Sequence, residues 1–138
     1  MRVRRFSIVW PVAALALLSV ACGELAPDEA DRDSPPFERS YIEVRPGHKV
    51  SHDVEVESGA ILEYRVEASG DVNVWLFDPQ GLELGRWERA DHVALDSIEA
   101  ELTGGYTFEF DNYYSRVTRK SVTLLHRVIP AGQASSDE

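Results

Sequence analysis

The stretch from residue 106 to residue 127 constrains the fold of this chain more than any other. Its aromatic residues occupy every second position at the start: Tyr106, Phe108 and Phe110. This alternation is typical of a β-strand with one buried face. The strand pattern stops at Asp111 and Asn112, whose short side chains favour turns. An apolar-rich run over residues 117–129 follows, and we expect a second strand there.

The chain before this stretch follows the same plan, with short alternating runs separated by turn-forming sequences. Four such sequences lie at residues 45–48, 58–59, 69–71 and 78–81. The first fits a type II turn, and the last fits a type I turn with a glycine bulge. About seven or eight strands are expected, and turns at this spacing are typical of a small antiparallel β-sandwich. The sequence therefore predicts an all-β domain made of two packed sheets.

Two segments depart from simple alternation. Residues 74–77 are all apolar, which indicates a central strand covered on both faces or one that lies beside a ligand surface. Residues 91–102 have apolar residues at positions that fit a helix as well as a bent strand. No repeat with a period of about 20 to 50 residues is found, so solenoids and propellers are excluded.

The N-terminus has the pattern of a cleaved signal. Three arginines precede an apolar run over residues 6–21, and small residues lead to Cys22. The run is shorter than the ~20 apolar residues that a membrane-spanning helix needs. Residues 1–22 resemble a bacterial lipoprotein signal, with Ser19 where most such signals have an aliphatic residue. The resemblance implies a diacylated Cys22, and the alternative is ordinary secretion that leaves a free thiol.

We expect four segments along the chain: the signal (1–22), a flexible acidic tether (23–38), a β-domain (39–130) and a short flexible tail (131–138). The tether contains three prolines and a cluster of acidic residues with few large apolar side chains, so it cannot bury enough surface to fold. Fully extended, it spans about 50 Å, which is enough to hold the domain clear of a bilayer.

The charge of the chain narrows the classes of partner. The chain has 14 basic and 24 acidic residues and a net charge of −10 at pH 7. Loss of residues 1–22 removes three of the basic residues and none of the acidic ones, which leaves −13. Such a surface repels nucleic acids and anionic membranes, because phosphate binding needs a basic footprint. We expect no nucleic-acid partner, and membrane contact only through the lipid anchor.

The sequence contains no HExxH, CxxC, phosphate-loop or GxSxG motif, and it has a single cysteine. His48 and His52 share a strand face but lie roughly 13 Å apart along it, too far to bind one metal ion. His52 and His126 have the phase of buried positions, and we expect both to be packed and hydrogen-bonded. Acidic clusters such as residues 53–57 could hold calcium, but their alternation with core residues favours a solvated strand face. We therefore predict no catalysis, no metal site and no cofactor.

The corner after the aromatic strand has a motif over positions 110–120: an aromatic residue, Asp, Asn, two further residues and Ser, then a basic residue. This motif resembles the end of GOLD (Golgi dynamics) domains, the β-sandwich modules of secretory-pathway cargo proteins and of some lipid-transfer proteins. The resemblance covers residues 40–129. A rival resemblance relates residues 74–81 to the central strand and turn of bacterial pre-peptidase C-terminal domains, another small β-sandwich. The side chains expected to hold the corner are Asp111, Asn112 and Ser115.

Aromatic and basic residues follow this corner in an otherwise acidic chain. The candidate binding residues are Tyr113, Tyr114, Arg116, Arg119 and Lys120. Because aromatic and arginine side chains are enriched where proteins meet, this group could dock an acidic partner or a lipid head group. The alternative is that the basic residues protect an exposed edge strand near residue 117 from aggregation.

Two functions fit these features. The first is a non-catalytic lipoprotein of the bacterial cell envelope, at the outer membrane or the periplasmic face, whose β-sandwich binds another envelope protein. The second is a lipid- or glycan-binding β-sandwich, suggested by Trp75 and Trp87, which could stack on a sugar unless they belong to the core. The sequence does not name the partner.

Overall fold

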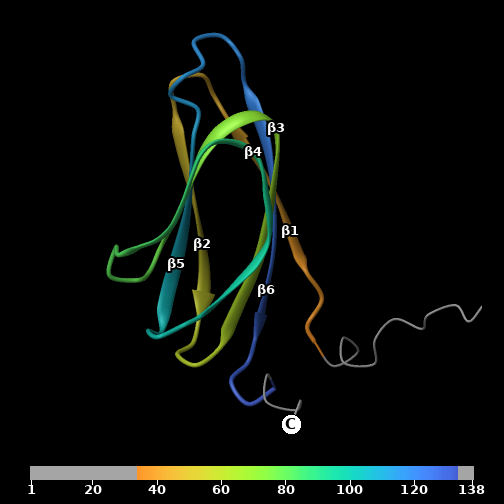
Figure 1. Ribbon diagram of the computed structural model, residues 1–138, viewed down its shortest axis with the longest axis vertical. Coiled ribbons are helices and arrows are strands. Elements are labelled where there is room, and N and C mark those ends of the chain that lie inside the picture. The colour runs from red at the N-terminus through yellow and green to blue at the C-terminus, as the bar shows by residue number, and fades with distance from the viewer. Residues whose placement is uncertain (1–33, 134–138) are drawn as a thin grey trace, which may run out of the picture.

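The computed structural model describes residues 34–133, which form an all-β domain of antiparallel strands (Figure 1). In chain order the strands are β1 (Glu38–Val44), β2 (Lys49–Val56), β3 (Ile61–Phe77), β4 (Glu83–Glu99), β5 (Gly104–Asp111) and β6 (Lys120–Ile129). No helix that could cross a membrane is found in this range. The expected signal with Cys22, most of the expected tether and most of the expected tail lie outside the described residues.

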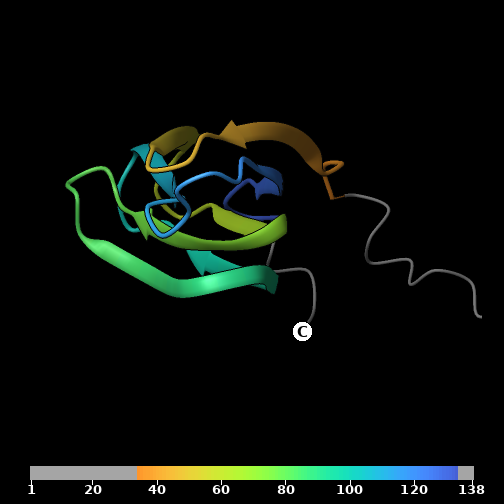
Figure 2. The same cartoon turned by 90° about the horizontal axis from the view of Figure 1, so that it is seen from above.

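The strands form one hydrogen-bonded sheet in the order β1-β6-β3-β5-β2, and β4 pairs with the other edge of β3. Residues 61–68 of β3 pair with β6, and residues 73–77 of β3 pair with β5. β4 pairs with both of these segments. The β3–β4 hairpin therefore bends between them and belongs to both halves of the sheet. The sheet curls so that its end strands, β1 and β2, approach each other (Figures 1 and 2).

The expected strand count is only partly met, because the described residues form six strands in one sheet rather than about seven or eight in two. The main reason is the segment 69–71, for which the turn prediction is wrong. The structure places this segment inside β3, where the pairing with β4 shifts register. Such irregularities bend a strand without ending it. One long bent strand thus replaces two strands separated by a turn.

The ambiguous segment 91–102 is a strand as far as Glu99, where β4 ends. Pairing with β3 holds it extended, and Val93, opposite Val66, is buried. Leu95, by contrast, is 58% exposed. The helix-like spacing of the apolar residues therefore did not mark a single buried face.

The last strand differs from the prediction in its start and its place. It begins at Lys120 rather than at Val117, which lies in the preceding loop and is exposed. β6 also pairs with β1 on one edge and with β3 on the other. The expectation of an exposed edge strand near residue 117 is therefore wrong.

Two predicted turns are confirmed by their hydrogen bonds. In the β1–β2 turn, the His48 amide donates to the Arg45 carbonyl oxygen at 3.1 Å, and Gly47 has a φ of 69°. In the β3–β4 turn, the Gly81 amide donates to the Asp78 carbonyl oxygen at 2.9 Å, and Gly81 has a φ of 85°. Positive φ values cost glycine little, which explains its place in both turns.

The interior of the curled sheet is apolar, as the alternation predicts. Its largest buried side chains come from the three strands β3, β5 and β6: Leu62, Tyr64, Leu76, Tyr106, Phe108, Phe110 and Leu124. Phe108 and Phe110 stack with their ring centroids 6.4 Å apart, and Tyr64 packs edge-on to Phe108 at 5.3 Å. Each large apolar side chain removed from water contributes about 1.5 to 3 kcal/mol, so this cluster is the main source of stability.

Candidate functional site

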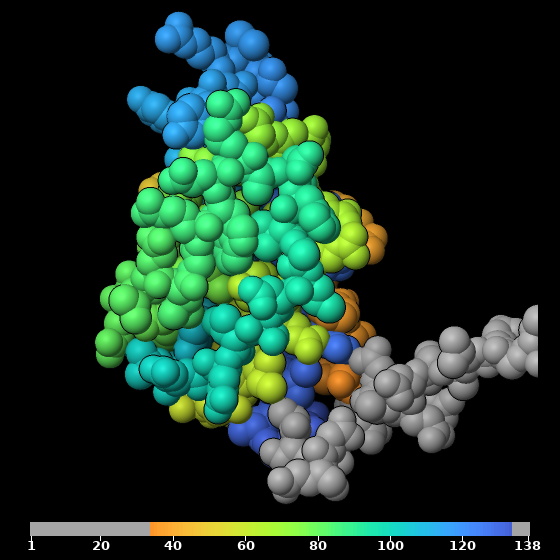
Figure 3. All heavy atoms as spheres, in the orientation of Figure 1, coloured from red at the N-terminus to blue at the C-terminus, as the bar shows by residue number. Residues whose placement is uncertain are grey.

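One end of the curled sheet carries the candidate binding residues, and we call it the tip. It consists of the β1–β2 turn (residues 45–48), the β5–β6 loop (residues 112–119) and the bend of the β3–β4 hairpin, at the top of Figure 1. The β5–β6 loop projects beyond the rest of the domain in the space-filling view (Figure 3). β1 begins and β6 ends at the opposite end of the domain (Figure 1).

The predicted corner residues attach the β5–β6 loop to the sheet. Asn112 is only 2% exposed, and its side-chain amide donates to the carbonyl oxygens of Val44 at 3.2 Å and Thr118 at 2.8 Å. The Asp111 carboxylate accepts a hydrogen bond from the amide two residues later, at 2.7 Å. The Ser115 hydroxyl accepts one from the Thr118 amide at 2.8 Å. Both ends of the loop are therefore held in place by side chains.

The loop is also bonded to the β1–β2 turn. The Gly47 amide donates to the Asn112 carbonyl oxygen, and the Asn112 amide donates to the His48 carbonyl oxygen, both at 3.0 Å. A hollow of about 460 Å³ lies between turn and loop, and its lining residues are Pro46, Gly47, Tyr113, Tyr114, Ser115 and Arg116. The structure thus brings a predicted turn and three of the predicted binding residues into one site.

Two tyrosines form the aromatic part of the tip. Tyr113 is 72% exposed and Tyr114 is 64% exposed, and their rings meet edge-on with centroids 6.1 Å apart. The Arg89 guanidinium lies 5.4 Å from the centre of the Tyr114 ring, within the range of a cation–π contact. The loop's aromatic residues are therefore supported on one side by β4.

Sequence reasoning missed Arg89. It lies at the bend of β4 with a φ of 50°, which is uncommon for a residue other than glycine. The side-chain oxygen of the buried Asn73 accepts a hydrogen bond from the Arg89 amide at 2.8 Å and so supports this conformation. Nothing in the local sequence marks Arg89, because its contact with Tyr114 depends on the bend of the hairpin.

The basic candidates differ in their environments. The Lys120 side chain is only 12% exposed, and its ammonium lies 3.4 Å from Asp71, which Arg89 also contacts at 2.8 Å. The hydrogen bonds from Arg89 and Lys120 lower the pKa of Asp71 below its usual value. Arg119 pairs with Glu43 at 2.8 Å. Arg116, in contrast, forms no ion pair with another residue of the range 34–133.

These positions remove the edge-strand alternative for the basic group. Lys120 opens β6, an interior strand, while Arg116 and Arg119 lie in the loop before it. Lys120 joins β6 to the β3 bend, so its role is structural. The exposed part of the predicted set is therefore the pair of tyrosines together with Arg116.

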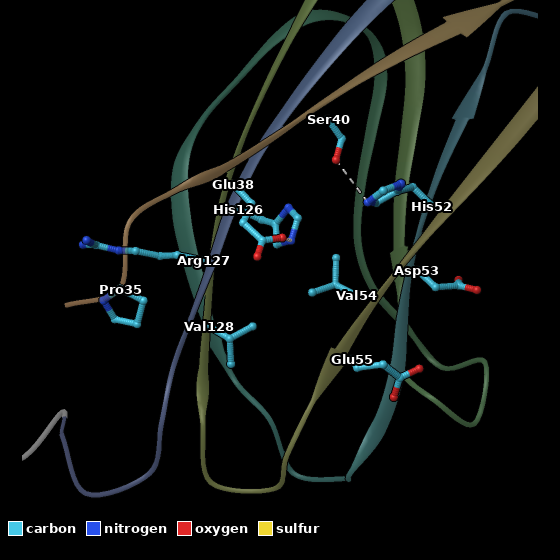
Figure 4. A pocket seen from close by; sticks show the side chains of 10 residues that line it. All are labelled: Pro35, Glu38, Ser40, His52, Asp53, Val54, Glu55, His126, Arg127 and Val128. Atoms are coloured by element: carbon cyan, nitrogen blue, oxygen red, sulfur yellow. Dashed lines mark hydrogen bonds and ion pairs between the residues drawn. The ribbon is translucent and has the colours of Figure 1, made fainter.

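A second hollow, of about 510 Å³, lies at the seam where β1 and β2 approach (Figure 4). The imidazole Nε2 of His52 lies 3.4 Å from the Ser40 hydroxyl, and that of His126 lies 3.3 Å from the Glu38 carboxylate. The two imidazole rings meet edge-on at 6.0 Å. Burial lowers the pKa of His126, against the attraction of Glu38. His126 is thus a packed core residue, as its phase predicted.

The seam does not show a complete catalytic or metal-binding arrangement. A serine beside a histidine is the start of a nucleophile–base pair, which needs a third group to orient the histidine. In the described part of the chain no carboxylate bonds the second ring nitrogen of His52. Nor do any three His, Cys, Asp or Glu side chains between residues 34 and 133 form a group that could hold a metal ion.

The two tryptophans named for sugar stacking are both half-buried. The Trp87 ring packs edge-on to the buried Tyr64 ring at 5.9 Å, so it belongs to the margin of the core. Trp75 lies on β3 between its partners β4 and β5. The described residues therefore do not display these tryptophans as a fully open aromatic platform.

Comparison with known proteins gives information on the fold of this domain only. No protein-family model and no curated protein sequence matches the chain. Among solved structures, the periplasmic lysozyme inhibitor PliG of Aeromonas hydrophila, an inhibitor of g-type lysozyme, is similar with a TM-score of 0.56 and 13% identity, over 67% of this chain and 86% of that one. At this identity the likeness indicates a shared all-β fold.

Two further structures have lower scores. A de novo designed double-stranded β-helix matches with a TM-score of 0.41 and 16% identity, over 65% of this chain and 99% of that one. A family 29 carbohydrate-binding module in complex with cellulohexaose matches with 0.40 and 14% identity, over 72% of this chain and 76% of that one. Both scores are too low to indicate a common fold.

Proposed function

We propose that this protein is a non-catalytic binding module that recognises another protein through its tip. The observation that carries the proposal is the projecting β5–β6 loop, in which Tyr113 and Tyr114 are exposed while Asn112 fixes the loop base. Exposed aromatic side chains on a rigid support bind with a small loss of conformational entropy.

The proposal includes a lipid anchor at Cys22 and a place in the bacterial cell envelope. The lipoprotein-like signal supports the anchor, and the position of β1 supports the presentation of the site. Because β1 begins at the end opposite the tip, a tether leading to Glu38 would direct the tip away from the membrane (Figure 1). The lysozyme inhibitor with a similar fold is periplasmic and acts on a protein, which is compatible with this proposal.

The GOLD-like β-sandwich remains part of the proposal. The motif at positions 110–120 supports it, as do the two halves of the curled sheet that share the β3–β4 hairpin. Lipid or glycan binding is the alternative function. Its sequence support comes from Trp75 and Trp87, whose half-buried rings favour it less than the exposed tyrosines favour a protein partner.

Site-specific photo-crosslinking in the native cells tests the proposal. A photoreactive residue replaces Tyr114 in the full chain, and the matched control replaces Leu82, an exposed apolar residue of the β3–β4 turn. We expect a discrete protein adduct from position 114 that is missing from position 82. Adducts with lipid or glycan alone would favour the alternative, and the absence of any specific adduct from position 114 would contradict protein binding through the tip.

A further inference from the structure

We infer that the tip binds a carboxylate of its partner, presented by an acidic surface loop that also carries an apolar side chain. This inference rests on the proposed function and names the chemistry of the segment that the tip recognises. It depends on the charges, the hydrogen-bond donors and the orientation of the tip.

Two guanidinium groups of the tip, those of Arg45 and Arg116, form no ion pair within residues 34–133, and only Arg116 lines the hollow. Arg89 and Lys120 share Asp71, and Arg119 pairs with Glu43. Arg116 lines the hollow and has no acidic partner among residues 34–133. Against a net charge of −10 for the chain, this is a local excess of positive charge. A planar guanidinium matches the geometry of a carboxylate, with which it forms two parallel hydrogen bonds.

The backbone of the loop adds further donors. Within the described residues, the amides of Tyr114 and Arg116 donate to no other group, whereas the amides of Tyr113 and Ser115 are bonded to Asp111 and Asn112. Both free amides belong to residues that line the hollow, and backbone N–H groups that donate to a carboxylate form charge-assisted hydrogen bonds. The hollow of about 460 Å³ has room for one carboxylate side chain and its neighbour.

The aromatic residues of the tip favour an apolar side chain next to the carboxylate of the partner. Tyr113 and Tyr114 expose ring surface at the rim of the hollow, so an apolar side chain beside the acid would cover surface that is now in water. The Arg89 side chain holds the Tyr114 ring from the β4 side. Arg89 is therefore a positioning residue for the tip.

An anionic lipid surface fits the tip less well than an acidic protein loop. Attraction to such a surface is worth about 1 kcal/mol for each nearby Lys or Arg, so stable attachment needs a cluster of unpaired cations. Arg89 and Lys120 are already paired with Asp71, and Arg119 is paired with Glu43, so only Arg45 and Arg116 at this end of the described chain have no acidic partner among residues 34–133. The tip also lies at the end of the domain opposite the start of β1 (Figure 1).

Nuclear magnetic resonance of the isotope-labelled full chain in neutral detergent micelles tests the inference. The probes are acetyl-Leu-Asp-Leu-amide, its uncharged isostere acetyl-Leu-Asn-Leu-amide, and glycerol 3-phosphate as the soluble form of a lipid head group. We expect saturable shifts of the amide signals of Gly47, Tyr114 and Arg116 with the acidic peptide. The isostere should bind about tenfold more weakly, because it lacks the charge-assisted hydrogen bonds.

Two variants connect this preference to Arg116. Arg116→Gln should abolish the preference for the acidic peptide, and Arg86→Gln, which removes an exposed guanidinium of β4 outside the tip, should leave it intact. Equal binding of the two peptides, no response at the tip, or a stronger response to glycerol 3-phosphate would overturn the inference. If the peptides give one of these results but the crosslinker at position 114 captures a protein, only the carboxylate preference is wrong and the proposed function stands. If the crosslinker captures no protein, the proposed function is wrong whatever the peptides show.

Discussion

The strand β5 and the β5–β6 loop follow each other in the chain and are both rich in aromatic residues, yet their environments are opposite. The aromatic residues of β5 are almost completely buried, whereas Tyr113 and Tyr114 of the loop are mostly exposed. Aromatic content therefore does not distinguish core from surface. The period-two alternation does distinguish them, because the aromatic residues are buried as far as the alternation extends and exposed after it ends.

The change from one environment to the other occurs at Asn112. This residue is buried, and its neighbour Tyr113 is largely in solvent. Its side chain bonds β1 and the end of the loop, so the loop does not depend on its own aromatic residues for its position. Stability therefore depends on β5, and the proposed function assigns recognition to the loop.

Replacing Phe110 by alanine should have the largest effect on stability. Phe110 is fully buried, stacks on Phe108 and lies opposite Val74 in the pairing of β3 and β5. We expect a loss of about 3 to 5 kcal/mol in the free energy of unfolding, because the large buried ring leaves a cavity. Denaturant unfolding followed by circular dichroism measures it. An unchanged unfolding midpoint would show that Phe110 does not belong to the core.

Asn112→Ala tests the boundary itself. The variant leaves the carbonyl oxygens of Val44 and Thr118 without the bonds that the side chain donates. Unsatisfied buried polar groups cost about 1 to 3 kcal/mol, so the expected loss lies below that of Phe110→Ala. The same unfolding experiment measures it, with Ser115→Ala as a milder control that removes one acceptor from the loop. A loss no larger than that of the control would place the boundary elsewhere.

The interior of the domain was largely predictable from the sequence, and the bend of its hairpin was not. Alternation in β5 identified buried aromatic residues correctly, because burial on one face of a strand imposes a period of two. Residues 69–71 have the composition of a turn, but they continue β3. The pairing of β3 with β6 before this segment and with β5 after it decides the outcome. These partners lie far away in the sequence, so local turn chemistry does not report them.

The candidate site was only partly predictable, because some of its contacts also join residues that lie far apart in the sequence. Residue types marked Tyr113, Tyr114 and Arg116 as exposed candidates, and these three line one hollow. The same criteria also selected Lys120, whose ammonium instead contacts Asp71 from across the β3 bend. The support that Arg89 gives to Tyr114 was likewise invisible, because it depends on how the β4 strand bends. Local composition identified candidate binding residues, but tertiary contacts determine which of them are exposed at the site.

The stability of the domain should depend on pH through His126, a polar residue at the margin of the interior. Burial lowers the pKa of His126 below 6.5, although Glu38 partly offsets this effect. As the pH falls, His126 therefore becomes protonated at a higher pH in the unfolded chain than in the folded chain. The stability that the neutral imidazole provides is fully present above pH 6.5 and is lost as the pH falls through the folded-state pKa.

Unfolding measured between pH 5 and pH 7.5 detects this effect as a decrease toward acid pH that is smaller in His126→Gln than in the natural chain. His92→Gln, at an exposed position of β4, is the matched control and should keep the natural slope. Identical slopes for the natural chain and His126→Gln would show that another group causes the pH dependence. Because the attraction of Glu38 opposes desolvation, we expect a smaller change than that caused by Asn112→Ala.

The smallest effect on stability is expected at the tip. A small effect there would distinguish the β5–β6 loop from strand β5 most directly. Tyr114→Ala removes a ring that is 64% exposed and meets Tyr113 and Arg89, so the free energy of unfolding should change by only about 0.5 kcal/mol. The same variant should lose most of the binding of the acidic peptide, because it removes one wall of the hollow. Denaturant unfolding and the peptide titration are measured on one preparation. A loss of stability near that of Phe110→Ala would mean that the loop belongs to the folding core, and the division between a stabilising strand and a recognising loop would then be wrong.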